Sequence, residues 1–185
     1  EILSPTLDFN SGVISKAPIL FDEQYLERIT ALVAENVAIA RTDWDSFETS
    51  WDFTTHSLVY LSKGLWDATA IAATMDYYYG YLPEASCPLE ICYLLWQGQC
   101  KERFEKLKAN EEELNRIFIG IYGLQDELTP DVPLDEITIL QQGEISIEDN
   151  KIVWHDDVLM KQLISYAVGC MMGRYSIDHL GLILA

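Results

Sequence analysis

Apolar residues recur at helical spacing in several stretches of the chain. In the first stretch, Asp22 is placed to cap a helix over about 23–41. The apolar stripe of this helix comprises Leu26, Ile29, Val33 and Val37, and Leu32 widens it. A second helix is expected over about 66–80, in a stretch rich in Ala and Tyr that ends at Gly80 and Pro83.

The strongest helical pattern covers residues 88–122. Pro88 suits the first turn of a helix, and Gly123 suits the left-handed residue that follows one. The seam consists of Phe104, Leu107, Leu114, Phe118 and Ile121, with Glu111 at the remaining seam position. A break near Ala109, with Asn110 capping a second helix, would give a hairpin instead of one long helix. Both arrangements predict a structural spacer or bundle element.

A last helix is expected from Asp156 or Asp157, acting as its cap, to about Arg174. Its expected buried face consists of Leu163, Ile164, Ala167, Val168 and Met171. Gly169 and Gly173 are four residues apart, and this small-residue strip predicts close packing against a neighbouring helix.

Two regions have extended character. Residues 1–21 alternate apolar and polar positions around Pro18, which suits a sheet edge. Short β-prone runs occur at 137–140, 145–147 and 152–154, and residues 148–151 suit a hairpin turn. We therefore expect a mainly α fold, a helical bundle or connector with a small β element: the N-terminal extended segment and a hairpin near 137–154. Residues 1–185 would form one α-rich connector domain of a larger protein, with 131–157 as a β-hairpin insertion.

Aromatic and acidic residues alternate through 42–53 without a helical period over much of the stretch. We interpret the stretch as a structured loop with four buried aromatic anchors: Trp44, Phe47, Trp51 and Phe53. The alternative is an exposed aromatic patch that binds a partner. Large rings are more often buried than exposed, which favours the anchors.

The charge balance restricts the partners of this chain. Its 185 residues include 30 acidic and 12 basic ones, a net charge of -18. This argues against a free-standing nucleic-acid binder and against binding to an anionic membrane surface. The sequence also contains no apolar run of about 18 residues, the length of a membrane span. A dense carboxylate surface could mimic DNA phosphates, but keeping the polypeptide soluble is the simpler interpretation.

Four cysteines, at positions 87, 92, 100 and 170, lack the C-x-x-C spacing of zinc knuckles and thioredoxin-type sites. We expect reduced thiols, and hence a cytoplasmic protein. The chain begins at Glu1 rather than Met and ends in the apolar run 180–185. Because free termini are usually polar, we expect a piece of a longer protein.

The sequence contains no nucleotide-binding glycine loop, no P-loop and no G-x-S-x-G nucleophile elbow. Its histidines, His56, His155 and His179, are scattered, and three adjacent residues such as 155–157 do not normally converge on one ion. No carboxylate lies in a pattern that would raise its pKa by burial beside a like charge. Cys170 has no activating base nearby in the sequence. We therefore assign no catalytic, cofactor-binding or metal-binding residue.

Four runs of residues resemble one known family. They are ILSPTLDFNSGVISKAPI at 2–19, RTDWDSFETSWDF at 41–53, ERFEKLKANEEELNRIFIGIYGLQDELTP at 102–130 and ISYAVGCMMGRYSID at 164–178. These runs resemble the part of large adenine-specific DNA methyltransferases that lies C-terminal to the catalytic core. The most similar members are the phage-exclusion (BREX, PglX-like) enzymes and single-chain type II restriction-modification proteins. The resemblance covers roughly two thirds of the chain, and 57–100 and 131–157 look like lineage-specific insertions.

The resemblance implies a parent protein that methylates the N6 of adenine in DNA from S-adenosylmethionine, in self-marking or phage defence. The family's cofactor loop, F-x-G-x-G, and its catalytic motif, N-P-P-Y, are both absent from this sequence. No catalytic or cofactor residue can therefore be carried over. The implied role is a non-catalytic helical fragment, inactive alone, that links the catalytic core to the target-recognition region. Its partners would be these flanking domains, and DNA through the parent protein.

The charge pattern agrees with a segment that leaves most of the contact with DNA to other domains of the parent protein. The best concentration of basic residues is Lys101, Arg103, Lys106 and Lys108, and Glu102 and Glu105 interrupt it. This pattern is typical of a solvated helix face rather than of a phosphate-binding track, so no DNA-contact residue is assigned. Two alternatives remain: a stand-alone acidic interaction protein such as a DNA mimic, and an accessory domain of a nuclease or helicase.

Overall fold

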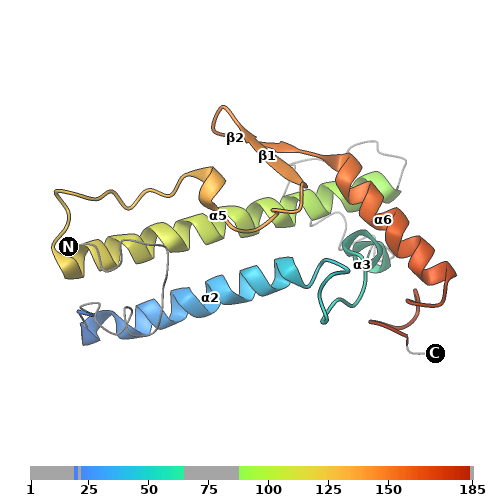
Figure 1. Ribbon diagram of the computed structural model, residues 1–185, viewed down its shortest axis with the longest axis horizontal. Coiled ribbons are helices and arrows are strands. Elements are labelled where there is room, and N and C mark those ends of the chain that lie inside the picture. The colour runs from blue at the N-terminus through green and yellow to red at the C-terminus, as the bar shows by residue number, and fades with distance from the viewer. Residues whose placement is uncertain (1–18, 21, 65–87, 184–185) are drawn as a thin grey trace, which may run out of the picture.

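The computed structural model describes residues 19–20, 22–64 and 88–183, and this part of the chain is mainly helical (Figure 1). Its elements are the 3-10 turn Glu23–Tyr25, helices α2 (Leu26–Trp44), α3 (Ser57–Gly64) and α5 (Pro88–Tyr122), the 3-10 turn Leu134–Glu136, strands β1 (Ile145–Glu148) and β2 (Lys151–Trp154), and helix α6 (Asp156–Met171). The expected fold class, mainly α with a small β element, is confirmed. No helix in these ranges is both long and apolar enough to cross a bilayer. The helix expected at 66–80 lies outside the described residues, and so does the extended segment expected at 1–21 except for residues 19–20.

Helix α5 is one unbroken helix of 35 residues, so of the two arrangements that the sequence left open the single long helix is the correct one. At about 1.5 Å per residue its length is about 52 Å. Gly123, with φ +69°, ends it, and the N–H of Leu124 donates to the carbonyl of Ile119 at 3.0 Å. The cap expected at Asn110 is wrong, because this residue lies inside the helix and its side chain is buried.

Helix α2 lies antiparallel beside α5 (Figure 1). Asp22 caps the preceding 3-10 turn as expected, accepting a hydrogen bond from the N–H of Gln24 at 3.1 Å. The helix continues to Trp44 rather than to 41, and the N–H of Asp45 still donates to the carbonyl of Arg41 at 2.8 Å. The two helices lie side by side over most of the length of α2.

The apolar stripe expected on α2 is largely wrong. Its buried apolar residues are Leu32 and Ile39, whereas Leu26, Val33 and Val37 are exposed. The buried seam instead follows positions 29, 32, 36, 39 and 43, which are three and four residues apart. Apolar residues occur on two faces of this Ala-rich helix, so only packing against α5 decides which face is buried.

The main core forms where the first half of α5 meets α3, α6 and the segment before β1. Its buried residues are Ile39, Leu58, Cys92, Trp96, Cys100, Phe104, Leu107, Val132, Ile137, Ile139, Leu140 and Leu159. The β-prone run at 137–140 is not a strand, yet three of its four side chains lie in this core. Residues 131–157 therefore share the core of the helices rather than forming a separate packing unit.

The β hairpin has the turn that the sequence predicted. Strands β1 and β2 are antiparallel, with Ile145 opposite Trp154 and Glu148 opposite Lys151. The two turn residues, Asp149 and Asn150, have φ values of +49° and +58°. Two consecutive left-handed residues match the sheet twist in a two-residue hairpin, and Asp and Asn tolerate this conformation.

Two of the four expected aromatic anchors are buried. Phe47 and Phe53 lie in the interior, and the ring of Phe53 packs edge-on against Tyr166 and Tyr175 at centroid distances of 5.9 and 5.4 Å. The expectation is wrong for the two tryptophans: Trp44 is 55% exposed at the end of α2, and Trp51 is 102% exposed. Along this turn-rich connection, exposed and buried rings therefore alternate in chain order.

The expected face of α6 is also wrong. Its buried residues are Leu159, Tyr166 and Gly169, and Leu163 is partly buried against the core. The exposed residues include four of the five that were expected inside: Ile164, Ala167, Val168 and Met171. Asp156 and Asp157 lie in the first turn of α6 rather than at the cap position, where His155 stands without a side-chain capping bond.

Within the ranges that the structure describes, the two glycines at the end of α6 contact no neighbouring helix, contrary to expectation. A Cβ on Gly169 would lie 2.7 Å from the ring of Tyr175, so the glycine permits the returning C-terminal segment to pack against the helix. Gly173 has φ +76° and lies beyond the last helical residue, Met171, rather than inside a helix reaching 174.

Candidate functional site: a buried polar cluster between the helices

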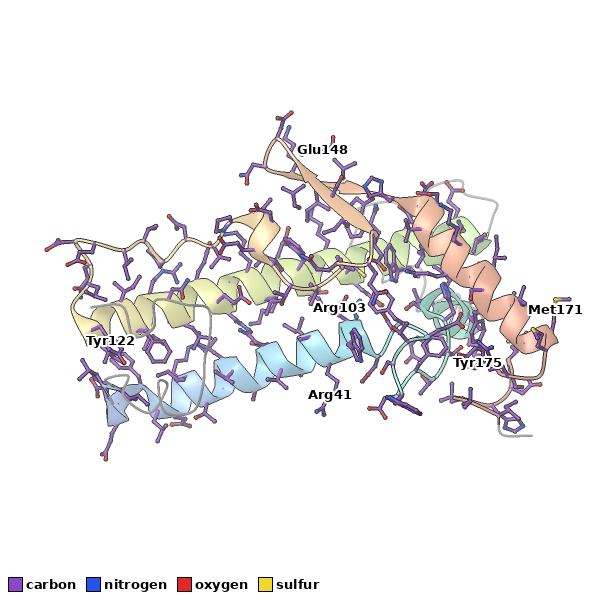
Figure 2. The ribbon with its side chains drawn as sticks, in the orientation of Figure 1. Arg41, Arg103, Tyr122, Glu148, Met171 and Tyr175 are labelled. Atoms are coloured by element: carbon purple, nitrogen blue, oxygen red, sulfur yellow. The ribbon has the colours of Figure 1, made fainter. Side chains whose placement is uncertain are left out.

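The helices meet at a cluster of polar side chains, which is the strongest candidate site in the described residues. Its members come from both long helices, α6 and two connecting segments: Asp43, His56, Cys100, Arg103, Glu144 and Gln162. Arg103 lies on the side of α5 that faces the C-terminal end of α2 (Figure 2). Four of these residue types commonly serve in catalysis, so their geometry decides what the cluster can do.

The two carboxylates hold the segment that precedes β1. Both oxygens of Asp43 accept from the N–H of Leu140, at 3.2 and 3.3 Å. Leu140 has φ +59°, a left-handed conformation that a bulky residue rarely adopts. Glu144 is almost fully buried and accepts from the N–H of Gln142 at 3.0 Å and from Nε2 of Gln162 at 2.8 Å. The carboxylates therefore connect this segment to α2 and to α6.

The electrostatics of this pair contradict the expectation from sequence. Burial raises the pKa of Asp43 to about 6, and the nearby Glu144 raises it further, against the lowering effects of the Leu140 N–H and of Arg103. The expectation that no carboxylate would be buried beside a like charge is therefore wrong. The burial of Asp43 could have been predicted, because this residue continues the helical spacing of the buried seam of α2. Glu144 follows a glycine in a connecting segment, where no periodic pattern predicts burial.

The histidine and the cysteine of the cluster are not arranged for nucleophilic catalysis. Burial lowers the pKa of His56 to about 4, so the imidazole is neutral at pH 7. Burial likewise raises the pKa of Cys100 to about 11, so the thiol stays protonated. The Nδ1 atom of His56 accepts from the N–H of Leu58 at 3.2 Å, and Sγ of Cys100 accepts from Nη2 of Arg103 at 3.2 Å. No hydrogen bond joins the imidazole to the thiol within the described residues, and a base–nucleophile pair requires one.

The space enclosed within the cluster is too small for a substrate. The cavity that its side chains enclose has a volume of about 10 Å³, and a single water needs roughly 10–15 Å³. A wider, open groove of about 360 Å³ lies beside it, with Thr42, Asp52, Tyr60 and Arg103 among its lining residues. The cluster itself therefore has the properties of a structural polar network.

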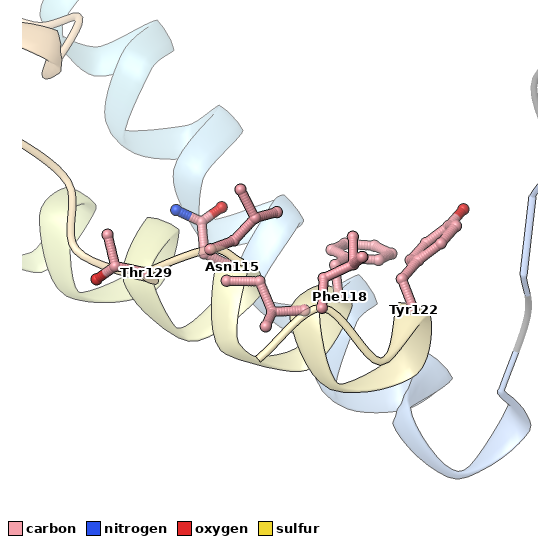
Figure 3. A pocket seen from close by; sticks show the side chains of 7 residues that line it. Asn115, Phe118, Tyr122 and Thr129 are labelled. Atoms are coloured by element: carbon pink, nitrogen blue, oxygen red, sulfur yellow. The ribbon is translucent and has the colours of Figure 1, made fainter. Parts of the chain in front are cut away.

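A second cavity, of about 420 Å³, lies at the far end of α5 (Figure 3). Its lining is mostly apolar: Asn115, Phe118, Ile119, Tyr122, Leu124, Leu128 and Thr129. It contains no ionisable acid or base other than the Tyr122 phenol, and so offers surface for packing rather than groups for proton transfer.

Four of the five basic residues of α5 face carboxylates. Lys101 pairs with Glu105, Lys108 and Arg116 pair with Glu112, and Lys106 reaches across to Glu35 of α2 at 3.3 Å. Arg103 is the exception within the described residues, and its guanidinium lies between the open groove and the buried carboxylates. Little positive charge is thus left on α5 for a phosphate.

The three histidines, which are scattered in the sequence, also lie in different surroundings in the structure. His155 Nε2 lies 3.0 Å from the Ser146 hydroxyl, across the hairpin, while His56 lies in the core and His179 is exposed. In the described part of the chain, no three His, Cys, Asp or Glu residues converge in a way that could hold a metal ion.

Comparisons with known proteins found two relatives that match the whole chain. It is 37% identical over 185 residues to the adenine-specific methyltransferase PglX of Lacticaseibacillus casei (strain Zhang). It is 30% identical over 188 residues to the adenine-specific methyltransferase BrxX of Escherichia coli O9:H4 (strain HS). Each match covers the whole chain, including 57–100 and 131–157, but the chain spans only 13% of the length of either relative. No protein-family model matches the sequence. The resemblance seen in the sequence is confirmed: over its whole length this chain is similar to one segment of these two adenine-specific methyltransferases, and it is a PglX-like fragment.

Proposed function

We propose that this chain is a non-catalytic helical connector inside a long adenine-specific DNA methyltransferase, between its catalytic core and its target-recognition region. The parent protein would transfer a methyl group from S-adenosylmethionine to N6 of adenine in DNA, for self-marking in phage defence. The observation that carries the proposal is α5, an unbroken 35-residue helix with α2 packed antiparallel along it. Two paired helices can hold two other domains at a fixed separation.

Polar contacts between α2 and α5 support the role of a rigid spacer. The buried amide of Asn110 donates to Glu35 Oε2 at 2.7 Å and to Asn36 Oδ1 at 2.9 Å. Lys106 adds an ion pair to the same Glu35. Because hydrogen bonds have narrow geometry, these contacts fix the axial register of the two helices more strictly than apolar packing alone does.

The charge distribution supports DNA contact by other parts of the parent protein. The chain carries a net charge of -18, and four of the five basic residues of α5 already pair with carboxylates. Affinity for duplex DNA comes largely from Lys and Arg that neutralise phosphates. A segment with this charge repels the DNA backbone, as expected of a connector that lies away from the bound duplex.

The chemistry of the buried cluster supports the absence of a catalytic role. Its histidine is neutral, its thiol is protonated, and its enclosed space has room for one water at most. The sequence also lacks the family's N-P-P-Y and glycine-loop motifs. The similarity to methyltransferases over the whole chain favours a connector over a stand-alone DNA mimic.

The test is to break α5 inside the full-length protein. Ala109 is an exposed residue in the middle of the helix, and Ala109→Pro removes a backbone hydrogen bond and bends the helix at a cost of about 3 kcal/mol. We expect site-specific methylation of a DNA duplex to be lost, while the affinity for S-adenosylmethionine is retained. The matched control is Ala109→Gly, which costs about 1 kcal/mol without removing the N–H, and which should retain most of the activity.

A charge-reversal variant separates a connector from a DNA-recognition element. Lys101→Glu in the full-length protein should leave the salt dependence of DNA binding unchanged. If Lys101 contacted a phosphate, the slope of log K against log salt would fall by about one unit. That result, or normal methylation by Ala109→Pro, contradicts the proposal.

A further inference from the structure

One face of α2 is exposed, apolar and uncharged. Between residues 29 and 40 the helix contains a single charged residue, Glu35, and that residue bonds to α5. The side turned away from α5 consists of Thr30, Ala31, Val33, Ala34, Val37, Ala38 and Ala40, all of them exposed. We call these seven residues, with Leu26 and Trp44 at the two ends, the outer face of α2.

The outer face is unusual for this chain. A helix face that meets water normally carries charged and polar side chains, and 23% of the residues of the chain are charged. Val33 and Val37 are nevertheless 44% and 54% exposed, and Trp44 is 55% exposed. Charged residues flank the stretch 29–40, with Glu27 and Arg28 on one side and Arg41 on the other. Arg41 lies between Val37 and Trp44 and projects away from α5 (Figure 2).

The spacing of the outer face matches that of a helix seam. Leu26, Val33, Val37 and Trp44 are separated by seven, four and seven residues. The inner seam of the same helix, through Leu32 and Ile39, has the equivalent spacing and packs on α5. Four alanines between the larger side chains permit a close interaxial approach. α2 thus has two seams on one helix, the pattern of a helix that lies between two others.

We propose that the outer face of α2 packs against an amphipathic helix from another part of the same long polypeptide. This inference rests on the proposed connector function. The occupant is taken from the same polypeptide because the chain spans only 13% of the length of its relatives, which leaves most of such a protein outside the structure to supply the covering helix. A connector that transmits position also needs a lateral contact with the domain it supports, and the outer face runs along α2 for most of its length.

The test measures thiol protection in the full-length protein without DNA. Val37→Cys places a thiol on the outer face, and Glu105→Cys places a matched thiol on the exposed side of α5, where the side chain is 66% exposed. Alkylation of each thiol by iodoacetamide is followed by peptide mapping, so that Cys170 and the other native cysteines are counted separately. Rates in denaturant correct for intrinsic reactivity.

We expect alkylation of the thiol in the Val37→Cys variant to be at least about tenfold slower than that of the control site. The protection should stay constant over a roughly hundredfold range of protein concentration, because an intramolecular contact does not depend on concentration. Equal rates at the two sites would overturn the inference. Protection that grows with protein concentration would indicate a second copy as the occupant and would also overturn it.

The two proposals fail separately. If Ala109→Pro leaves methylation intact while the Val37→Cys site is protected, the outer face is covered but the chain is not a rigid connector. If methylation is lost in Ala109→Pro while the Val37→Cys site reacts as fast as the control, the connector stands and the lateral contact does not. A variant Val37→Ala, which keeps the helix and removes two methyl groups, should leave alkylation at the Glu105→Cys site unchanged.

Discussion

The two halves of the α2–α5 pair are stabilised in different ways. In the junction half, residues 88–107 of α5 are surrounded by α3, α6, the hairpin and the end of α2 (Figure 1). In the distal half, the described residues that residues 108–122 of α5 face are the first half of α2, Leu20 before it, and the segment that leads to Leu134–Glu136. Large buried rings, Trp96 and Phe104, lie in the junction half, whereas the distal half contains the buried amide of Asn110.

This difference indicates how a long helix pair can project from a small core. The junction half gains its stability from apolar burial, which is roughly proportional to area and is not directional. The distal half buries few side chains, Leu32 and Ile117 among them, and relies on the hydrogen bonds that Asn110 makes to α2. Polar contacts give the distal half a defined register, and the junction half supplies most of the folding free energy.

The same substitution in the two halves gives the largest expected contrast. Phe104 is almost fully buried in the junction half, and Phe104→Ala should lower the free energy of unfolding by about 3–5 kcal/mol. Phe118 in the distal half is 41% exposed, and Phe118→Ala should cost about 1 kcal/mol. Urea denaturation of both variants measures the two values. Losses of similar size would remove the distinction between the halves.

A second substitution tests the polar contacts of the distal half. Asn110→Ala removes the donors to Glu35 and Asn36 and should cost about 1–2 kcal/mol. The matched control is Asn115→Ala on the same helix, whose amide donates to the carbonyl of Pro130 from an exposed position. We expect this control to cost about 0.5 kcal/mol or less. A smaller effect at 110 than at 115 would show that the buried amide does not stabilise the helix pair.

The buried carboxylate in the junction half predicts a pH dependence. Because the pKa of Asp43 is raised from 3.8 to about 6, its contribution favours the folded state at low pH and is lost as the pH rises through about 6. His56, with a pKa lowered to about 4, acts in the opposite direction: its contribution is present above 6.5 and is lost as the pH falls through about 4. Asp43→Asn removes only the first effect and retains an acceptor for the Leu140 N–H.

We therefore expect Asp43→Asn to gain stability relative to the parent chain as the pH rises from 4 to 7. After a reduction for the partial exposure of this carboxyl, the gain is about 1–2 kcal/mol. Thermal unfolding across this pH range measures it, and Asp52→Asn, the same substitution at an exposed position, serves as the matched control. An offset for Asp43→Asn that is constant with pH would show that the carboxylate is effectively solvated.

The smallest expected effect concerns the aromatic residues of the segment between the helices. Trp51→Ala should change the free energy of unfolding by less than about 0.5 kcal/mol, because the indole is fully exposed. Phe53→Ala, two residues along the chain, should cost about 3 kcal/mol or more, since the ring packs between two tyrosines. Comparable losses would place the Trp51 ring in the interior.

Local signals in the sequence predicted the parts of the fold that depend on neighbouring residues. Pro88 and Gly123 gave the ends of α5, Asp22 gave the start of the first helix, and residues 148–151 gave the hairpin turn. Each of these features depends on the backbone preference of one or two residues, so no tertiary contact is needed to predict it.

Features set by tertiary contacts were not predictable in the same way. Apolar residues cover two faces of α2 and of α6, and the sequence offered no means of choosing between these faces before α5 and the core were placed. Asn110 has the residue type of a cap, but its hydrogen bonds go to a helix 74 and 75 residues earlier in the chain. The proximity of Asp43 and Glu144 likewise depends on the whole fold.

The central claim, that this chain carries no catalytic site of its own, is tested most directly by titrating S-adenosylmethionine into the purified 185-residue chain and then adding duplex DNA. We expect no saturable heat of binding and no methyl group on adenine, while the full-length protein shows both under the same conditions. Saturable binding of the cofactor by the isolated chain, or methylated adenine in its presence, would contradict the account.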